Sequence, residues 1–332
     1  MTTAAKLPTR TLGRTGFSVS EIGFGGWGIG KSMWGHTEDT ESLNALRSAI
    51  ERGVTYFDTA AVYGHGHSER LIAQVGREMN TDLVIATKVP PKNMEWPAHA
   101  RTRLPYAFPP DWVRSSAERS LRNLRAERVD LLMFHVWTDA WLKDPLWPET
   151  MDAFERLTKE GKIGSVGISI NSDDPESAIK AVETGLIDVV QVILNLFDQR
   201  PIARLLPLCA EKNVGVVVRC PFDEGGLTGT LRPDTRFAPE DFRSHYFGGE
   251  RLAETCRRGR ELESLLVGPL AATLAQAALK FGLSFPEIST VIPGMRTQDH
   301  VEANVRAADG RYFDARLLQE LKKHAWVRDF YR

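Results

Sequence analysis

Cysteine is scarce in this chain, and its placement excludes some kinds of site. The 332 residues include three cysteines, an odd number. They lie far apart, at Cys209, Cys220 and Cys256, without the paired spacing that a metal site requires. This pattern predicts no cysteine metal site and favours reduced thiols in a reducing compartment.

Long apolar runs and an excess of one charge are also missing. No stretch approaches the roughly 20 apolar residues that a membrane span requires. The first ten residues lack the apolar segment of a signal peptide. The formal net charge is -1, which gives no field that would attract nucleic acid or an anionic membrane. We therefore expect a cytoplasmic protein that binds neither nucleic acid nor a membrane.

The chain does contain a long alternation of strand and helix patterns. Residues 9–20 alternate around Gly13 and Gly16 and predict an N-terminal β-hairpin. Eight strands follow, at residues 22–24, 56–58, 83–88, 129–135, 163–169, 189–192, 214–219 and 288–292. Helices are predicted at residues 40–52, 69–75, 110–123, 148–160, 175–183, 201–211 and 270–281, and then at 298–308 and 315–326.

This order is typical of an α/β barrel. We predict a (β/α)8 TIM barrel with an N-terminal β-hairpin and extra C-terminal helices, as a single domain over residues 1–332. A doubly wound sheet is the competing architecture, but no single switch-point signature favours it. Residues 90–109 and 222–249 are too long for simple connections, and both follow barrel strands. We therefore place them on the active-site face as functional loops.

Polar residues stand at or just beyond the ends of three successive strand patterns. Asp58, Lys88 and His135 close these runs, and Tyr63 follows Asp58 by five positions. In a parallel barrel these strand ends share the face on which active sites are built. Each residue alone has an ordinary structural explanation, as a cap, a solvated strand end or a structural histidine. Together they predict a catalytic site.

The four residue types suit proton transfer. A phenol has a reference pKa of about 10, too high to release a proton readily at neutral pH. A cationic Lys88 beside Tyr63 stabilises phenolate, and Asp58 holds Lys88 charged and oriented. The set Asp58, Tyr63, Lys88 and His135 resembles the catalytic set of the aldo-keto reductases.

The resemblance covers essentially the whole chain. Residues 12–16 are similar to the family's opening hairpin, 23–27 to its first strand and loop, and 161–169 to its fifth strand. Residues 291–294, followed by Arg296 and Asn304, resemble its adenosine-phosphate segment. The resemblance implies an NAD(P)H-dependent oxidoreductase that reduces a small aldehyde or ketone to an alcohol. It gives Tyr63 the role of proton donor.

The resemblance also implies a cofactor site. The matching positions are Gly26, Trp27, Asp58, Ser169, Gln191, Arg219, Gly294, Arg296, His300 and Asn304. Arg296 can hold a 2′-phosphate through two parallel hydrogen bonds, so we expect NADPH, with NADH as the other possibility.

This chain departs from the family pattern at several cofactor positions. Arg219 stands where a tyrosine often stacks on the nicotinamide, and a guanidinium can also stack on a planar ring. After Ser169, Ile170 precedes Asn171, whereas the family often has an asparagine directly after the serine. His300 and Ala303 replace residues that many NADPH-binding members use.

Tryptophans in the predicted loops indicate an aromatic substrate pocket at the barrel mouth. We expect this pocket to be lined by Trp27, Trp34, Tyr63, His135 and Trp137 and to hold a small-molecule carbonyl substrate.

Two motifs suggest other functions. Residues 23–28 match G-x-G-x-x-G, but a Rossmann site requires a helix to open at once, and loop residues follow here. His65 and His67 could be ligands of a metal-dependent hydrolase, but Gly64 and Gly66 beside them favour a turn, so we expect no metal. A cofactor-binding regulatory barrel with little turnover is the alternative function.

Overall fold

Eight parallel strands form the centre of the molecule. The computed structural model describes residues 7–31, 33–35, 37–170, 174–268 and 270–327. The strands are hydrogen-bonded in the order β10-β9-β8-β7-β6-β5-β4-β3, and parallel bridges from Ile22 to Val291 and from Gly25 to Gly294 join the two edges. Their bounds are Phe24–Gly25 (β3), Tyr56–Asp58 (β4), Val84–Val89 (β5), Val129–Phe134 (β6), Ile163–Ser169 (β7), Val189–Ile193 (β8), Gly215–Arg219 (β9) and Thr290–Val291 (β10). The predicted (β/α)8 fold is therefore confirmed.

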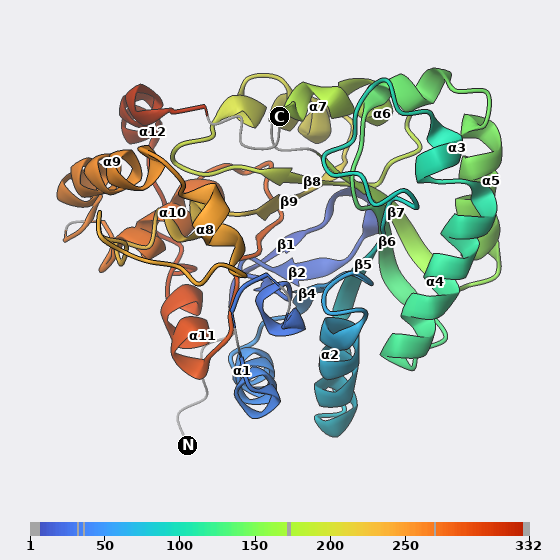
Figure 1. Ribbon diagram of the computed structural model, residues 1–332, viewed down its shortest axis with the longest axis horizontal. Helices are drawn as coiled ribbons and strands as arrows, with labels where there is room; N and C mark the ends of the chain where they lie inside the picture. The colour runs from blue at the N-terminus through green and yellow to red at the C-terminus, as the bar shows by residue number, and fades with distance from the viewer. Residues whose placement is uncertain (1–6, 32, 36, 171–173, 269, 328–332) are drawn as a thin grey trace.

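Helices surround the strands (Figure 1). Those that correspond to predicted helices are Asp39–Glu51 (α1), His67–Glu78 (α2), Pro110–Leu124 (α4), Trp147–Lys159 (α5), Ile179–Glu183 (α6), Leu205–Glu211 (α7), Leu274–Leu283 (α10), Gln298–Val305 (α11) and Ala315–Leu321 (α12). The helices that the sequence analysis did not predict are Leu104–Ala107 (α3), Phe242–Tyr246 (α8) and Arg251–Leu266 (α9). None of the helices in the described ranges is both long and apolar enough to cross a membrane.

Strand alternation divides the core into two layers. One layer fills the barrel interior and includes Tyr56, Met133 and Val217, all fully buried. The other lies between the strands and the helices and includes Phe57 and Phe134. Neighbouring residues on one strand thus face different environments, which decides which polar side chains enter the barrel.

The N-terminal hairpin closes the barrel floor. Its strands are Thr9–Thr11 (β1) and Ser18–Ser20 (β2), and Leu12 and Val19 pack into the interior layer. Gly13 has φ +49°, and a Cβ there would lie 2.1 Å from the Gly215 nitrogen, so only glycine fits. This end is therefore unavailable to a ligand, and the open end is the opposite one.

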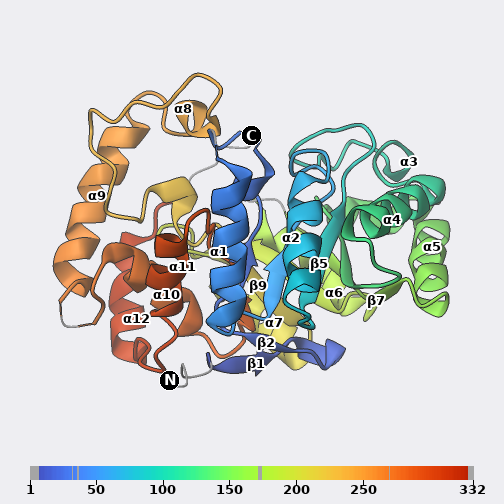
Figure 2. The same cartoon turned by 90° about the horizontal axis from the view of Figure 1, so that it is seen from below.

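The two long segments lie at that open end, away from the hairpin (Figure 2). Residues 90–109 contain α3, and residues 222–249 contain α8. Tyr246 and Phe247 form a small core of their own with Leu252 and Cys256 of α9. The second segment is therefore a folded substructure joined to α9.

Candidate active site

A buried ion pair lies just inside the barrel mouth. Lys88 Nζ donates to Asp58 Oδ1 at 2.6 Å and to the Thr59 carbonyl at 2.7 Å. Both residues of the pair are nearly inaccessible, at 1% and 3% exposure. Gln191 Nε2 donates to the other carboxylate oxygen of Asp58 at 2.7 Å. Asp58 thus accepts a hydrogen bond on each oxygen and fixes the position of the ammonium.

Tyr63 lies beside this pair on the loop that follows β4. The Lys88 ammonium is 5.1 Å from the centre of the Tyr63 ring. The edge of the His135 ring faces Tyr63, with ring centres 5.6 Å apart, and Trp27 stacks on it at 6.2 Å. The structure therefore brings Asp58, Tyr63, Lys88 and His135 together, as their spacing predicted.

Burial controls the protonation of these groups. Burial, and next the Asp58 carboxylate, raise the pKa of Tyr63 well above its usual range. Burial lowers the pKa of Lys88, and the charge and hydrogen bond of Asp58 oppose that shift. Burial, then the cations Lys88 and Arg219, lower the pKa of His135 well below its usual range. The site thus presents a protonated phenol and a neutral imidazole at neutral pH.

This arrangement can protonate an oxyanion. The phenol can donate a proton, and the adjacent ammonium can stabilise the phenolate that forms. The buried Nδ1 of His135 has no hydrogen-bond partner among the described residues. His135 as a whole is only partly buried, so its neutral ring can present a nitrogen to a ligand oxygen.

Polar side chains from three more strands continue the site. Ser169 Oγ lies 3.2 Å from Gln191 Oε1, so Ser169, Gln191 and Asp58 form one buried chain. Arg219 follows on β9, where Nη2 donates to the Ile170 carbonyl at 3.0 Å. Asn171 lies outside the described residues. The wall between β7 and β9 therefore offers amide, hydroxyl and guanidinium groups to a planar ligand.

The first barrel strand, β3, is followed by Gly26, which lets the backbone come close to Asp58. The Gly26 nitrogen donates to the Asp58 carbonyl at 2.8 Å, and a Cβ at Gly26 would lie 2.6 Å from the same oxygen. Two backbones can approach this closely only without a side chain. Gly26 therefore fixes Trp27 next to Tyr63.

The predicted adenosine segment follows β10. Gly294 is exposed, and a Cβ there would meet no atom within 4 Å. Asn304 is buried, and its Nδ2 lacks a hydrogen-bond partner among the described residues. Arg296 donates to the Trp34 carbonyl at 2.8 Å, whereas His300 is exposed at the start of α11. An open backbone, an unsatisfied amide and a guanidinium fit a nucleotide.

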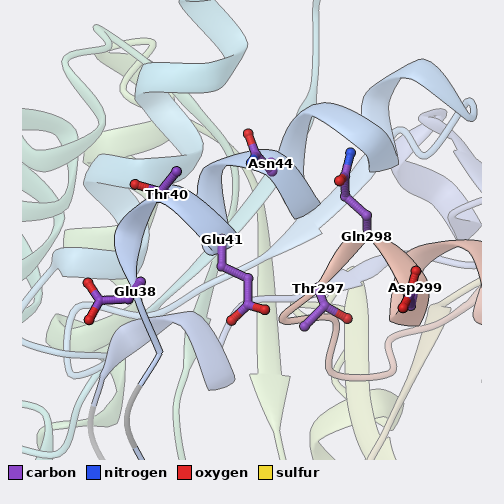
Figure 3. Close-up of a pocket in the computed structure, with 7 residues that line it drawn as sticks. All are labelled: Glu38, Thr40, Glu41, Asn44, Thr297, Gln298 and Asp299. Carbon is purple, nitrogen blue, oxygen red and sulfur yellow. The ribbon is translucent and has the colours of Figure 1, made fainter.

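An acidic groove of about 560 Å³ lies beside that segment, between the N-terminal ends of α1 and α11 (Figure 3). Figure 3 shows Glu41 of α1 near Thr297 and Asp299, and Glu38 also lines the groove. Negative charge disfavours a phosphate group, so these carboxylates oppose the attraction that Arg296 supplies. The predicted cofactor site did not include these carboxylates from α1.

Aromatic rings line the mouth of the barrel, but they are not all the residues that were predicted to line the substrate pocket. The edge of Trp34 faces Trp27, with ring centres 5.3 Å apart. Phe242 of α8 approaches Trp27 at 5.7 Å, and Trp96 meets the His135 ring at 4.7 Å. The sequence analysis did not assign Phe242 or Trp96 to the pocket. Their aromatic character in long loops was the signal that could have found them.

The structure corrects the prediction that Trp137 lines the substrate pocket. It is fully buried, packs against Phe134, Trp141 and Trp147, and donates to Asp139 Oδ1 at 3.0 Å. A side chain with no accessible surface can line no open pocket. Trp137 instead belongs to the core outside the barrel, because β6 ends at Phe134 and the chain bends at His135 and Val136, so the strand alternation that would turn residue 137 inward no longer applies.

The two motifs that suggested other functions have structural explanations. After the glycine-rich residues 23–28, the chain forms a short 3-10 turn, Gly28–Gly30, and α1 begins only at Asp39. His67 Nε2 lies 2.7 Å from Asp39 Oδ1, which also accepts from Lys31. Within the described ranges, no three histidine, cysteine, aspartate or glutamate side chains cluster as metal ligands do.

A (β/α)8 barrel with a Tyr–Lys–Asp–His group at its open end defines a class of nicotinamide-dependent oxidoreductases. The aldo/keto reductase family model matches residues 21–325, and the chain belongs to that family. Members of the family act on small carbonyl compounds with nicotinamide cofactors, so the protein is an oxidoreductase of that type.

Individual relatives are distant in sequence but span the chain. Aldo-keto reductase YhdN of Bacillus subtilis is 28% identical over 302 residues, which are 88% of this chain and 86% of the relative. NADH-specific methylglyoxal reductase of Escherichia coli is 25% identical over 324 residues, 93% of this chain and 97% of the relative. The structure of glycerol dehydrogenase AKR11B4 from Gluconobacter oxydans has a TM-score of 0.76 at 26% identity, covering 98% and 95% of the two chains.

Proposed function

We propose that the protein reduces an aldehyde or ketone to an alcohol, with Tyr63 as the proton donor. The observation that carries this proposal is the buried Lys88–Asp58 ion pair beside the Tyr63 ring. A bound nicotinamide would supply the hydride to the carbonyl carbon. Tyr63 protonates the carbonyl oxygen as negative charge develops on it, Lys88 stabilises the resulting phenolate, and His135 orients the oxygen.

The proposed cofactor site consists of the polar side chains on β7 to β9, the loop after β3 and the segment after β10. Ser169 and Gln191 would bind the carboxamide, Arg219 would stack on the nicotinamide, and Gly26 and Trp27 would border it. Gly294, Arg296, His300 and Asn304 would hold the adenosine end, and the unsatisfied Asn304 amide supports this assignment. The remaining substrate pocket would be Trp27, Trp34, Tyr63 and His135. The three cysteines are free, which supports a reducing, cytoplasmic setting.

A survey of aldehydes, ketones and sugars, followed by NADPH absorbance, tests this function. The alternative is a regulatory barrel that binds the cofactor without rapid turnover. Cofactor binding with no turnover of any carbonyl compound would favour that alternative and contradict ours.

We propose NADPH as the preferred cofactor, with Arg296 as the anchor of the 2′-phosphate. Arg296→Ala should weaken the binding of NADPH by roughly 10- to 100-fold, which is the effect of losing one charge-assisted hydrogen bond. It should leave the binding of NADH nearly unchanged. Glu41→Gln is the matched opposite change, because it removes a carboxylate from the adjacent groove, and it should tighten NADPH. Dissociation constants for both cofactors measure these effects. Equal losses for NADPH and NADH, or a wild-type preference for NADH, would overturn the assignment.

The aromatic rim should govern substrate binding, with little effect on barrel stability. Trp96 is 42% exposed and contacts the His135 ring, so Trp96→Ala should raise the KM of a carbonyl substrate while changing the Tm little. Tyr106→Ala is the matched control, because Tyr106 lies on the same segment and is 67% exposed. Equal KM values for both variants and the wild type would show that the segment does not contact substrate.

A further inference from the structure

Glu69 is a buried carboxylate that the proposed mechanism does not use. It lies in the first turn of α2 and is 0% exposed. Thr87 Oγ1 donates to one carboxylate oxygen at 2.6 Å, and Asn123 Nδ2 donates to the other at 2.7 Å. Both donors are neutral, and among the described residues no cation forms an ion pair with Glu69. A buried carboxylate with only neutral partners costs free energy, so its role requires an explanation.

The position of Glu69 connects it to the catalytic pair. Thr87 directly precedes Lys88 on β5. Because successive side chains on a strand point to opposite faces, Lys88 enters the barrel while Thr87 faces α2. The Glu69 carboxylate therefore lies on the outer side of the same strand segment that carries the ammonium.

The same alternation anchors the loop that carries Tyr63. Thr59, which follows Asp58, donates through Oγ1 to Ser68 Oγ at 2.9 Å, and Ser68 Oγ donates to the Gly26 carbonyl at 2.9 Å. The loop, residues 60–66, is thus held at its start by Thr59 and at its end by Ser68 and Glu69. Within it, the Tyr63 nitrogen donates to the Ala60 carbonyl at 3.0 Å.

Glu69 also contributes charge. Burial lowers the pKa of Lys88, and the Arg219 cation lowers it as well. Asp58 opposes that shift most strongly, and the negative charge of Glu69 adds to the opposition. The Asp58 carboxylate also accepts a hydrogen bond from Gln191. The Glu69 carboxylate is therefore a second source of negative charge for the ammonium, separate from Asp58.

We propose that Glu69 is a positioning residue that fixes the Tyr63 loop against β5 and, as a second buried carboxylate, keeps the Lys88 ammonium charged. The electrostatic part rests on the proposed function, because it concerns the lysine that assists Tyr63. The mechanical part, the anchoring of residues 60–66, stands independently of turnover.

The test of the electrostatic part is the pH dependence of carbonyl reduction in Glu69→Gln, which removes the charge and keeps the length of the side chain. Losing this charge lowers the pKa of Lys88 further, so the alkaline limit of kcat/KM should move to lower pH. Thr87→Val removes a hydrogen bond and keeps the charge, so it should lower kcat without moving that limit. Glu78→Gln removes an exposed charge from the same helix and should change neither quantity.

An unmoved alkaline limit in folded Glu69→Gln would overturn the electrostatic part. Should Glu69→Gln not fold, Glu69→Asp and Thr87→Val still decide the proposal. Both loosen the loop, so both should lower kcat more than they weaken cofactor binding. An unchanged kcat in both variants, with only a lower Tm, would show that Glu69 contributes to stability and does not position the Tyr63 loop.

Hydrogen exchange tests the mechanical part without any substrate. The Tyr63 and Ser68 amides should exchange faster in Thr87→Val than in the wild type or Glu78→Gln, because Ser68 N donates to the Tyr63 carbonyl at 3.2 Å within the anchored loop. Unchanged exchange would overturn the anchoring role. Absence of turnover in the wild type would instead contradict the proposed function, so the two failures are distinguishable.

Discussion

Replacing Tyr63 with phenylalanine is expected to remove nearly all carbonyl reduction while leaving cofactor binding largely intact. Burial keeps the phenol protonated in the free protein, and Lys88 is placed to stabilise the phenolate. Phenylalanine retains the ring that stacks on Trp27 and loses only the proton donor. General acid catalysis typically contributes about 10²–10⁴-fold, so kcat should fall by at least that factor. Single-turnover rates and cofactor dissociation constants provide the measurement.

Tyr56→Phe is the matched control for this experiment. Tyr56 is also fully buried, two residues before Asp58, and its hydroxyl lacks a hydrogen-bond partner among the described residues. Its removal should leave kcat close to wild type. If Tyr63→Phe retained more than about a tenth of the wild-type kcat with chemistry rate-limiting, Tyr63 would not be the acid.

Lys88→Met is expected to damage turnover more than folding and to remove the ionisation of Lys88 from the pH–rate profile. In the wild type, burial lowers the pKa of Lys88, so its charge is lost at lower pH than for an exposed lysine, and carbonyl reduction should decline as pH rises. Without the ammonium, the phenolate of Tyr63 forms less readily, and kcat should fall by about 10²-fold or more.

The lost ion pair also affects stability, and a second variant separates the two effects. Breaking a buried pair by removing one partner costs about 3–5 kcal/mol, because Asp58 stays buried without its cation. The double variant Lys88→Met with Asp58→Asn removes both charges, so it should regain much of the lost Tm but none of the turnover. Wild-type activity and pH dependence in folded Lys88→Met would eliminate the proposed coupling between Tyr63 and Lys88.

Local patterns in the sequence were sufficient to predict the barrel and to bring the proposed catalytic residues to one end of it. The predicted strands at residues 56–58 and 163–169 match β4 and β7 residue for residue, and all eight barrel strands were predicted. Their apolar runs are short and bounded by turn residues, so the pattern is readable from neighbours alone. Asp58, Lys88 and His135 follow directly, because the ends of parallel strands necessarily share one face.

Helix α9 was missed even though its signal is local. Its buried residues include Leu252, Cys256, Gly259, Leu262 and Leu266, spaced three or four apart, but many charged residues separate them. The last predicted strand, residues 288–292, was too long, because only Thr290 and Val291 pair with β9 as a strand.

Other features depended on contacts between distant segments, and these only the tertiary structure decided. Trp137 and Trp96 look alike in sequence, yet one is enclosed by Phe134 and Trp147 and the other lies exposed against His135. The carboxylate of Glu41 comes to the proposed adenosine segment from α1, at the other end of the chain. Periodicity indicates which face of an element is buried, but the residues that bury it are chosen when helices and loops pack together. The sequence alone therefore determined the barrel and the convergence of Asp58, Tyr63, Lys88 and His135 at its open end, whereas the aromatic walls and the charge around the proposed cofactor site were decided by packing.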